Sequence, residues 1–356
     1  MIDRDGTTGR ANYVKLWVFA QLIRTFGMAG TNLLRAVGLF DAPEPPHEVV
    51  VIPSTKGDRT ITINLYRNKA ALELTSGPTA VHLNWHGSGW IMPLHGQNGS
   101  FIRSIVQSEE LSQYPLTILD CSYALSPEHP CPADAEDARD AYEYVLAKKD
   151  KYDISKLTLS GFSAGGTLAL GLSVTLAAEL KAASNSEDSF EHPIKALATF
   201  YPLVTWLGEQ PTIDAPPNPW KTPGRETPEF VKNVIAASHF FAPSVSSKIS
   251  VEDDKERKMA LVSQPRISPA CARDEDFPPH LMIYTAEYDH LHVRTEELRE
   301  RLEKAGKSRI YGKRVIGVGH GWDLETKPGW AGYEERTEAY NAVIRLIRDV
   351  CSGSNS

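Results

Sequence analysis

A serine between small residues is the first sign of chemistry in this chain. The hexapeptide GFSAGG contains Gly161, Ser163 and Gly165 and fits the pattern G-x-S-x-G. It lies between a predicted strand, 156–161, and a predicted apolar helix, 164–180. That setting is typical of a nucleophile elbow, a sharp turn that lifts a serine hydroxyl clear of a sheet. Ser163 is therefore the predicted nucleophile, and a loop that only packs helix on strand is the alternative.

A second glycine-rich turn, HGSGW, follows the predicted strand 79–86. We call residues 86–90 the oxyanion loop, because its glycines would let backbone N–H groups face a developing oxyanion. We expect Ser88 and Gly89 to donate two hydrogen bonds and Ala164 a third. Each such donor contributes about 3 to 4 kcal/mol of transition-state stabilisation. An ordinary turn between a strand and a helix is the alternative interpretation.

A serine hydroxyl needs a base, and eleven histidines are available. His320 is the predicted base because it lies in GVGHGWD, after a predicted strand and before the last predicted helix. The flanking glycines would allow a loop to present the imidazole at the edge of the sheet. A histidine that only packs inside the fold is the alternative.

The base needs an acid that orients it. In α/β hydrolases the three residues follow the chain order Ser, Asp, His. Asp289 is the predicted acid, because it follows the strand-like run LMIYTAEY and lies between Ser163 and His320. Glu287, in the same turn, is the rival that the sequence leaves open.

Alternating strands and helices are predicted to position these residues. Helix-like patterns follow the 3.6-residue period, and strand-like runs are rich in β-branched residues. The predicted strands are 48–54, 59–67, 79–86, 116–123, 156–161, 195–203, 279–287 and 309–316, and the predicted helices are 133–149, 164–180, 293–306 and 331–351. This alternation predicts an α/β fold with a mostly parallel sheet and right-handed crossovers.

Four ordered blocks of sequence resemble the hormone-sensitive-lipase-like family of α/β hydrolases. The blocks are HGSGW, DCSYALSPEHPCPA, GFSAGG, and AEYDHL together with GHGW, and the resemblance runs from about residue 48 to the end. It implies an α/β-hydrolase fold with a helical cap. It also implies that four residues support the oxyanion loop without performing chemistry. These are His86, Gly87, Glu128 and His129.

The resemblance divides the chain into a core and a cap. The expected division is N-terminal cap helices at 1–45, core at 46–204 and 262–351, a Pro-rich cap insertion at 205–261, and a disordered tail at 352–356. Ser88 replaces the middle glycine that is usual in the family, so its hydroxyl would narrow the acyl site or contact substrate. Apolar cap residues would wall a pocket or simply pack. They are Trp17, Phe19, Leu22, Phe26, Trp206, Trp220, Phe240 and Phe241.

Composition excludes several classes of protein. The chain has 356 residues, 41% of them hydrophobic and 23% charged, which excludes intrinsic disorder. Its net charge of −7 lacks the basic excess that nucleic-acid binding requires. Four cysteines without a CxxC pair indicate a reducing, cytoplasmic location. Lys15, Arg24 and Arg35 divide the apolar stretch 13–40 into runs too short for a membrane span, so amphipathic helices are expected, with attachment to a membrane surface as the alternative.

Together these observations predict a serine carboxylesterase that acts on short-to-medium acyl esters and needs no cofactor. An amidase, lactonase, formamidase or acyltransferase would use the same three residues. A binding protein such as the gibberellin receptors that resemble this family is a further alternative. His290 and His292 lack the motif of a metal site, so no metal is expected. The expected partner is a small-molecule ester, not a nucleic acid or a membrane span, and a homodimer is left open.

Overall fold

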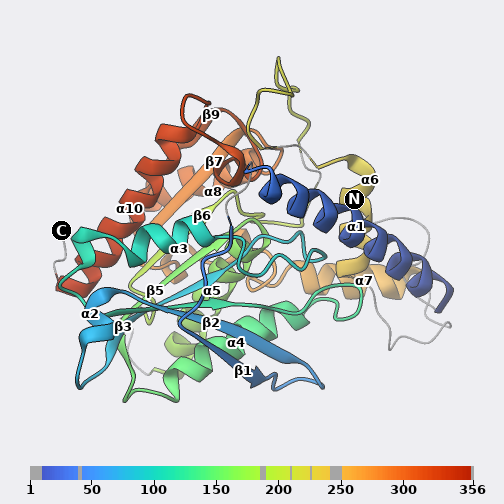
Figure 1. The fold of residues 1–356 in the computed structure, drawn as a ribbon. Coiled ribbons are helices and arrows are strands. Elements are labelled where there is room, and N and C mark those ends of the chain that lie inside the picture. Colours follow the sequence, from blue (N-terminus) through green and yellow to red (C-terminus); the bar gives the residue numbers. More distant parts are fainter. Residues whose placement is uncertain are drawn as a thin grey trace.

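A central sheet organises the computed structural model, which describes residues 10–38, 42–184, 190–208, 211–224, 227–240 and 251–353 (Figure 1). Nine strands lie within these ranges, in the order β1-β2-β4-β3-β5-β6-β7-β8, with β9 also paired to β7. Their bounds are Glu48–Pro53 (β1), Thr60–Arg67 (β2), Thr79–Trp85 (β3), Leu116–Cys121 (β4), Tyr152–Phe162 (β5), Ala196–Phe200 (β6), His280–Tyr288 (β7), Arg309–Tyr311 (β8) and Arg314–Gly319 (β9).

The burial of the central strands agrees with their direction. β3, β4 and β6 are buried at every position, as expected of strands covered on both faces. Every pairing among strands β3 to β9 is parallel. The pairings of β1 with β2 and of β2 with β4 are antiparallel. The predicted α/β class with a mostly parallel sheet is therefore confirmed.

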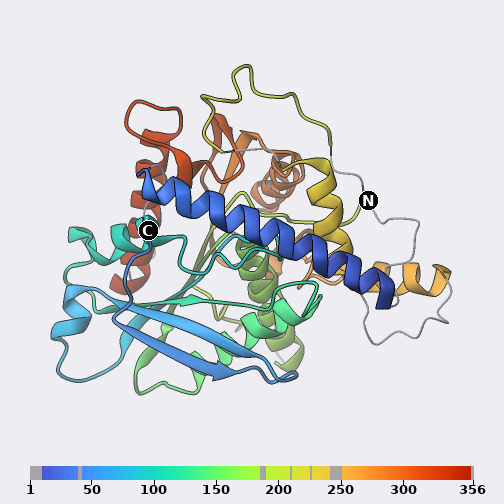
Figure 2. The same cartoon turned by 45° about the vertical axis from the view of Figure 1, so that its right-hand side comes forward.

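Helices cover both faces of the sheet and form two large hydrophobic cores (Figures 1 and 2). One core contains side chains of α4, α5 and α8, and the other contains side chains of α3 and α10. A smaller third cluster contains Cys131, Phe240, Val262 and Ile267. The helix bounds are Arg10–Ala36 (α1), Lys69–Glu73 (α2), Gly99–Val106 (α3), Ala133–Leu146 (α4), Ala164–Ala183 (α5), Glu229–His239 (α6), Val251–Val262 (α7), His292–Ala305 (α8), Trp322–Glu325 (α9) and Tyr333–Ser352 (α10).

Three predicted elements differ in detail from the structure. The run 309–316 forms two strands, because Gly312 adopts φ +94° and lies so close to β7 that a Cβ there would be 2.1 Å from the Ile283 carbonyl oxygen. The N-terminal segment is one helix of 27 residues, α1, which runs diagonally across the front of the molecule in the view of Figure 2. Of the predicted tail, Ser352 ends α10 and Gly353 caps it, while 354–356 lie outside the described residues.

Helix α5 is the one described helix that is long and apolar enough to cross a membrane by length and composition alone. Of its most apolar window, 61% is buried within the protein. Contacts with β5, β3, β6 and α4 account for this burial. Core helices commonly meet the same criterion, so the apolar character of α5 is explained by its packing against the sheet.

Candidate active site

The turn between β5 and α5 has the geometry of a nucleophile elbow. Ser163 is the N-cap residue of α5 and adopts φ 51° and ψ −120°, a conformation rare for a residue with a side chain. A Cβ on Gly161 would lie 2.2 Å from the Gly165 carbonyl oxygen, and a Cβ on Gly165 would lie 2.2 Å from that of Trp85. The small residues on either side of Ser163 are therefore required by close packing of the backbone.

The structure brings Ser163, Asp289 and His320 together at the carboxyl end of the sheet. His320 Nε2 lies 2.8 Å from Ser163 Oγ, and His320 Nδ1 lies 2.7 Å from Asp289 Oδ2. Because an ionised carboxylate only accepts hydrogen bonds, Nδ1 carries the proton and Nε2 is free to accept the serine proton. Asp289 is fully buried, and its Oδ1 also accepts a hydrogen bond from the Leu291 N–H at 3.1 Å.

Glu287 has a different contact from Asp289. Its Oε2 accepts a hydrogen bond of 2.8 Å from the backbone N–H of Gly317, in β9. Glu287 therefore fastens the strand that leads into the His320 loop, whereas Asp289 contacts the imidazole itself. His292 donates its backbone N–H to the Asp289 carbonyl oxygen at 2.9 Å.

Free backbone donors meet at the oxyanion loop. Within the described part of the chain, the N–H groups of Ser88, Gly89 and Ala164 have no protein acceptor. A Cβ on Gly87 would lie 3.2 Å from Ser163 Cβ, so the loop lies against the elbow. These three donors are thus available to a ligand bound beside the serine.

Neighbouring side chains hold the peptide groups of this loop. Gln97 Nε2 donates to the Gly87 carbonyl oxygen at 2.6 Å, and the Tyr123 hydroxyl donates to that of His86 at 2.7 Å. In a trans peptide the C=O and N–H point in opposite directions, so holding the Gly87 carbonyl fixes the direction of the Ser88 N–H. The sequence did not predict roles for Gln97 and Tyr123, although Tyr123 lies within the DCSYALSPEHPCPA block.

The Ser88 hydroxyl is engaged inside the loop. Ser88 is 6% exposed, and its Oγ accepts a hydrogen bond from the Trp90 N–H at 2.8 Å. The Tyr123 hydroxyl lies 2.7 Å from the same Oγ. These contacts favour a role in holding the loop over the predicted contact with substrate.

The predicted supporting residues have unequal contacts with the loop. The His86 ring is buried and stacks on Tyr123 at 4.7 Å, and burial, helped by nearby His95, lowers the pKa of His86 to about 3. His86 is therefore neutral at pH 7, and it supports the loop by packing against Tyr123. Among the described residues, no hydrogen bond joins the His129 ring to the loop; its backbone N–H donates to the Leu125 carbonyl oxygen.

Glu128 connects to the loop through a residue that the sequence did not predict, Arg24 of α1. Arg24 Nη1 and Nη2 each lie 2.7 Å from a Glu128 carboxylate oxygen. Arg24 also donates to the carbonyl oxygens of Ile91 and Ser126, both at 2.9 Å. Partial burial alone would raise the pKa of Glu128, but the hydrogen bond from Arg24 holds it below its usual value. One arginine thus joins α1 to the segment that leaves the oxyanion loop.

Parts of the predicted cap touch the loops that carry the site. A Cβ on Gly89 would lie 3.0 Å from Ile235 Cδ1, so α6 covers the oxyanion loop. The Gly319 N–H, next to His320, donates to the Pro223 carbonyl oxygen at 2.8 Å. The 205–261 segment therefore contacts the oxyanion loop and the strand end beside His320, whereas α1 contacts the segments that flank the loop.

Many of the apolar residues expected to wall a pocket are exposed. Trp206 and Phe240 pack against each other with ring centroids 5.0 Å apart. Five others are at least 41% exposed: Trp17, Phe19, Leu22, Phe26 and Trp220. Phe241 lies outside the described residues.

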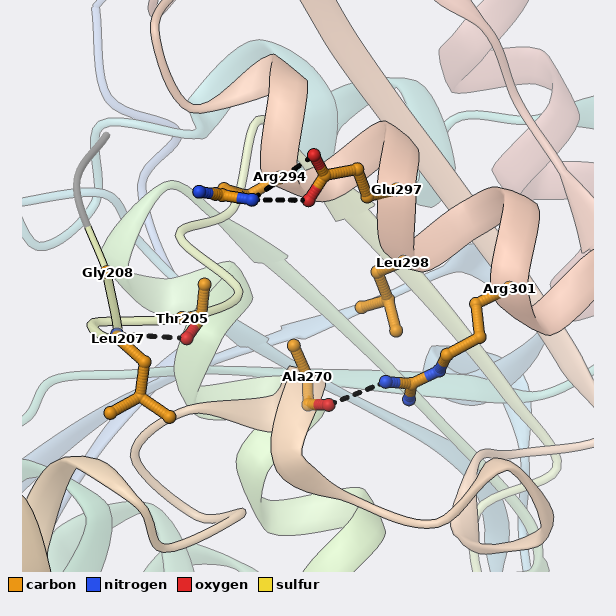
Figure 3. Close-up of a pocket in the computed structure, with 8 residues that line it drawn as sticks. All are labelled: Thr205, Leu207, Gly208, Ala270, Arg294, Glu297, Leu298 and Arg301. Carbon is orange, nitrogen blue, oxygen red and sulfur yellow. Dashed lines mark hydrogen bonds and ion pairs between the residues drawn. The ribbon is translucent and has the colours of Figure 1, made fainter. Parts of the chain in front are cut away.

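A cavity of about 490 Å³ lies between the start of the 205–261 segment and α8 (Figure 3). It is lined by Thr205, Leu207, Gly208, Ala270, Arg294, Glu297, Leu298 and Arg301. Arg294 and Arg301 lie along one wall, and Arg294 pairs with Glu297 at 2.9 Å. Because Ser163, Asp289 and His320 do not line this cavity, it is separate from the hydrogen-bonded triad.

Comparison with protein families and curated proteins gives the following matches. A family model described as the alpha/beta hydrolase fold matches residues 82–324. The esterase LipI of Mycobacterium tuberculosis is 29% identical over 143 residues, which cover 38% of this chain and 40% of the relative. The ethyl acetate hydrolase of Pseudomonas putida is 22% identical over 169 residues, covering 47% of this chain and 51% of the relative. The chain thus spans about half or less of the length of these curated relatives.

Solved structures match over more of the chain. A hyperthermophilic esterase from the archaeon Pyrobaculum calidifontis has a TM-score of 0.63 and 25% identity, covering 93% of this chain and 91% of that one. The thermostable carboxylesterase EstE1, from a metagenomic library, has a TM-score of 0.61 and 22% identity, covering 93% and 97%. The fold is therefore shared along nearly the whole length.

Proposed function

Because this chain belongs to the hormone-sensitive-lipase-like family of α/β hydrolases, we propose that it is a serine carboxylesterase acting on short-to-medium acyl esters. The observation that carries the proposal is the continuous hydrogen-bonded chain from Ser163 through His320 to buried Asp289. The esterases among its curated and structural relatives favour the same chemistry.

Acylation of the serine is the first step of the proposed mechanism. His320 Nε2 takes the Ser163 hydroxyl proton as the oxygen attacks the ester carbonyl carbon. The carbonyl oxygen becomes an oxyanion that accepts hydrogen bonds from the N–H groups of Ser88, Gly89 and Ala164. The protonated imidazole then gives its proton to the leaving alcohol as the C–O bond breaks, which leaves an acyl-serine.

Deacylation repeats these steps with water as the nucleophile. His320 takes a proton from water, the hydroxide adds to the acyl carbon, and Ser163 leaves with the proton returned by the imidazole. Asp289 accepts a hydrogen bond from Nδ1–H throughout and stabilises the imidazolium that forms in each step. All groups needed for these steps come from the chain itself.

A cap formed by α1 and the 205–261 segment is part of this proposal. Its support is the contact of Arg24 with Ile91, of Ile235 with Gly89 and of Pro223 with Gly319. A cytoplasmic location is also proposed, since all four cysteines, which lie in the described ranges, are unpaired thiols.

A panel of p-nitrophenyl esters from acetyl to decanoyl tests the proposed substrate range. We expect kcat/KM to be highest for acetyl to butyryl esters and to fall at least about tenfold by decanoyl. The reason is that each methylene that does not fit the acyl site costs about 1 kcal/mol or more. The structural reason is that α6 lies on the oxyanion loop, where Ile235 Cδ1 would be 3.0 Å from a Cβ placed on Gly89. Fastest cleavage of decanoate would contradict a confined acyl site.

Two comparisons sharpen this panel. Ser88→Gly should lower kcat by a similar factor for every ester, because the Ser88 hydroxyl holds the oxyanion loop. A changed preference among acyl chain lengths would instead place this hydroxyl in the acyl site. Cleavage of a p-nitroanilide faster than of the matching ester would make the protein an amidase.

Replacing Arg24 with methionine tests whether α1 positions the oxyanion loop. Hydrogen bonds to charged groups contribute about 1.5 to 3 kcal/mol, so we expect kcat to fall about tenfold or more while KM changes little. Arg24→Lys should recover part of the rate, because it keeps the charge but not the paired geometry. The matched control is Lys15→Met, an exposed cation on the same helix. An unchanged kcat in folded Arg24→Met protein would show that this contact does not act on the reaction.

A further inference from the structure

We propose that Cys131, Asp134 and His239 form a structural zinc site that joins the 205–261 segment to the core. A sulfur, a carboxylate oxygen and an imidazole nitrogen from these residues all lie within 4.8 Å of one another. These are three of the ligand types that zinc prefers. The site is separate from the proposed triad, and the sequence predicted no metal here because His239 is far in the chain from Cys131 and Asp134.

The three side chains are buried deeply enough for unsatisfied polar atoms to matter. Cys131, Asp134 and His239 are 7%, 3% and 2% exposed. Asp134 Oδ1 and His239 Nδ1 are both buried and make no hydrogen bond with any described residue. A buried polar atom without a partner costs about 1 to 3 kcal/mol, so two of them on side chains that also lie beside a buried thiol favour a bound ligand.

The surroundings fix each ligand in place. Asp134 lies in the first turn of α4, and its Oδ2 accepts a hydrogen bond from Trp90 Nε1 at 2.8 Å, which leaves Oδ1 available. The Cys131 N–H donates to the His239 carbonyl oxygen at 2.7 Å, so the backbone already joins the end of α6 to the start of α4. The His239 ring packs against Trp90 at 4.7 Å and Trp206 at 5.5 Å.

The charge of the three ligands suits a divalent cation. On binding, the buried thiol would lose its proton, and the resulting thiolate, a carboxylate and a neutral imidazole would carry −2 together, which one Zn²⁺ would neutralise. The nearby Arg257 is bound to Asp254 at 2.9 Å and to the Phe240 carbonyl oxygen at 2.8 Å.

The expected coordination is tetrahedral, with water as the fourth ligand. Zn–S and Zn–N distances of about 2.3 and 2.0 Å require ligand atoms about 3.3 to 3.5 Å apart in a tetrahedron, so side-chain rotations that bring the three atoms closer would complete the site. Because Asp134 also accepts a hydrogen bond from the Trp90 indole, a bound ion would stabilise Trp90, the last residue of the oxyanion loop. It would also stabilise the end of α6. The proposed role is structural, since none of the three residues contacts Ser163 or His320 through a described hydrogen bond.

Metal content of the tag-free full chain tests the proposal. The protein is incubated with excess Zn²⁺, passed through a desalting column in metal-free buffer and measured by mass spectrometry for zinc. We expect about one zinc per chain in the wild type and less than about 0.1 in Cys131→Ser and His239→Ala. The matched control is Cys271→Ser, which removes the exposed thiol most able to bind zinc adventitiously and should retain the ion. Wild-type protein without zinc, or zinc retained in Cys131→Ser, would overturn the proposal.

Two further measurements keep the test decisive if a variant fails to fold. Co²⁺ bound to wild-type protein should give thiolate-to-cobalt charge-transfer absorption. Absence of this absorption would overturn the metal site and favour a bridging water between the three side chains. Zn²⁺ should also raise the Tm of wild-type protein by about 3 °C or more, as expected for a ligand that binds only the folded state. Ser163→Ala protein should bind zinc normally, so the zinc site and the esterase proposal can fail independently.

Discussion

Replacing Ser163 with alanine is expected to lower kcat for p-nitrophenyl acetate by about 10⁵-fold or more. The proposed mechanism passes through an ester of Ser163 Oγ, and loss of the nucleophile in a triad removes nearly all of its contribution at once. The remaining rate would come from the oxyanion donors and from binding. Initial rates measure this loss at an enzyme concentration high enough for the residual rate to exceed the detection limit. Circular dichroism checks that the variant is folded.

A fluorophosphonate probe gives a second readout of the same prediction. Wild-type protein should be labelled once per chain, and Ser163→Ala protein should not be labelled. Ser112→Ala is the matched control, because the hydroxyl of this exposed serine donates to the Glu109 carbonyl oxygen at 2.6 Å and has no other hydrogen bond within the described ranges. Wild-type protein that resists the probe would favour a ligand-binding protein on this scaffold, and Ser163→Ala protein with more than a tenth of the rate would exclude Ser163 as the nucleophile.

Local constraints explain why much of the fold was predictable. The Ser163 elbow requires small residues at Gly161 and Gly165, because the backbone atoms of Gly165 and Trp85 leave no space for a side chain there. Strands buried on both faces are mostly apolar, and the predicted runs match β3 closely and contain β4 and β6. Where a constraint acts between neighbours in sequence, residue types reveal it.

Contacts between distant segments were not predictable in the same way. Arg24 meets Glu128 across 104 positions, and no pattern in α1 distinguishes it from Lys15 or Arg35. The strand break at Gly312 depends on the approach of β7 from another part of the chain. The cluster of Cys131 and His239 exists only because α6 packs against the start of α4. Such features follow from tertiary packing, so they emerge only in three dimensions.

Substituting Asp289 with asparagine should lower kcat by about 10⁴-fold while leaving the fold intact. Asparagine can keep the hydrogen bond from the Leu291 N–H with its oxygen, which would turn its NH₂ group toward His320 Nδ1. A donor in that position favours the tautomer with the proton on Nε2, and this nitrogen can no longer accept the Ser163 proton. Steady-state kinetics with short-chain esters measure the loss, and the Tm should change little because the two side chains are nearly equal in volume.

Glu287→Gln is the matched control, since it makes the same chemical change two residues away. Its carboxylate bonds to the Gly317 N–H and not to the imidazole, and glutamine can accept the same hydrogen bond, so we expect kcat within about tenfold of wild type. If Glu287→Gln were the more damaging variant, Glu287 and not Asp289 would orient His320. Residues that act as a unit are also non-additive. Asp289→Asn should therefore cost almost nothing more in a Ser163→Ala background, and a further large loss there would mean that Asp289 acts outside the triad.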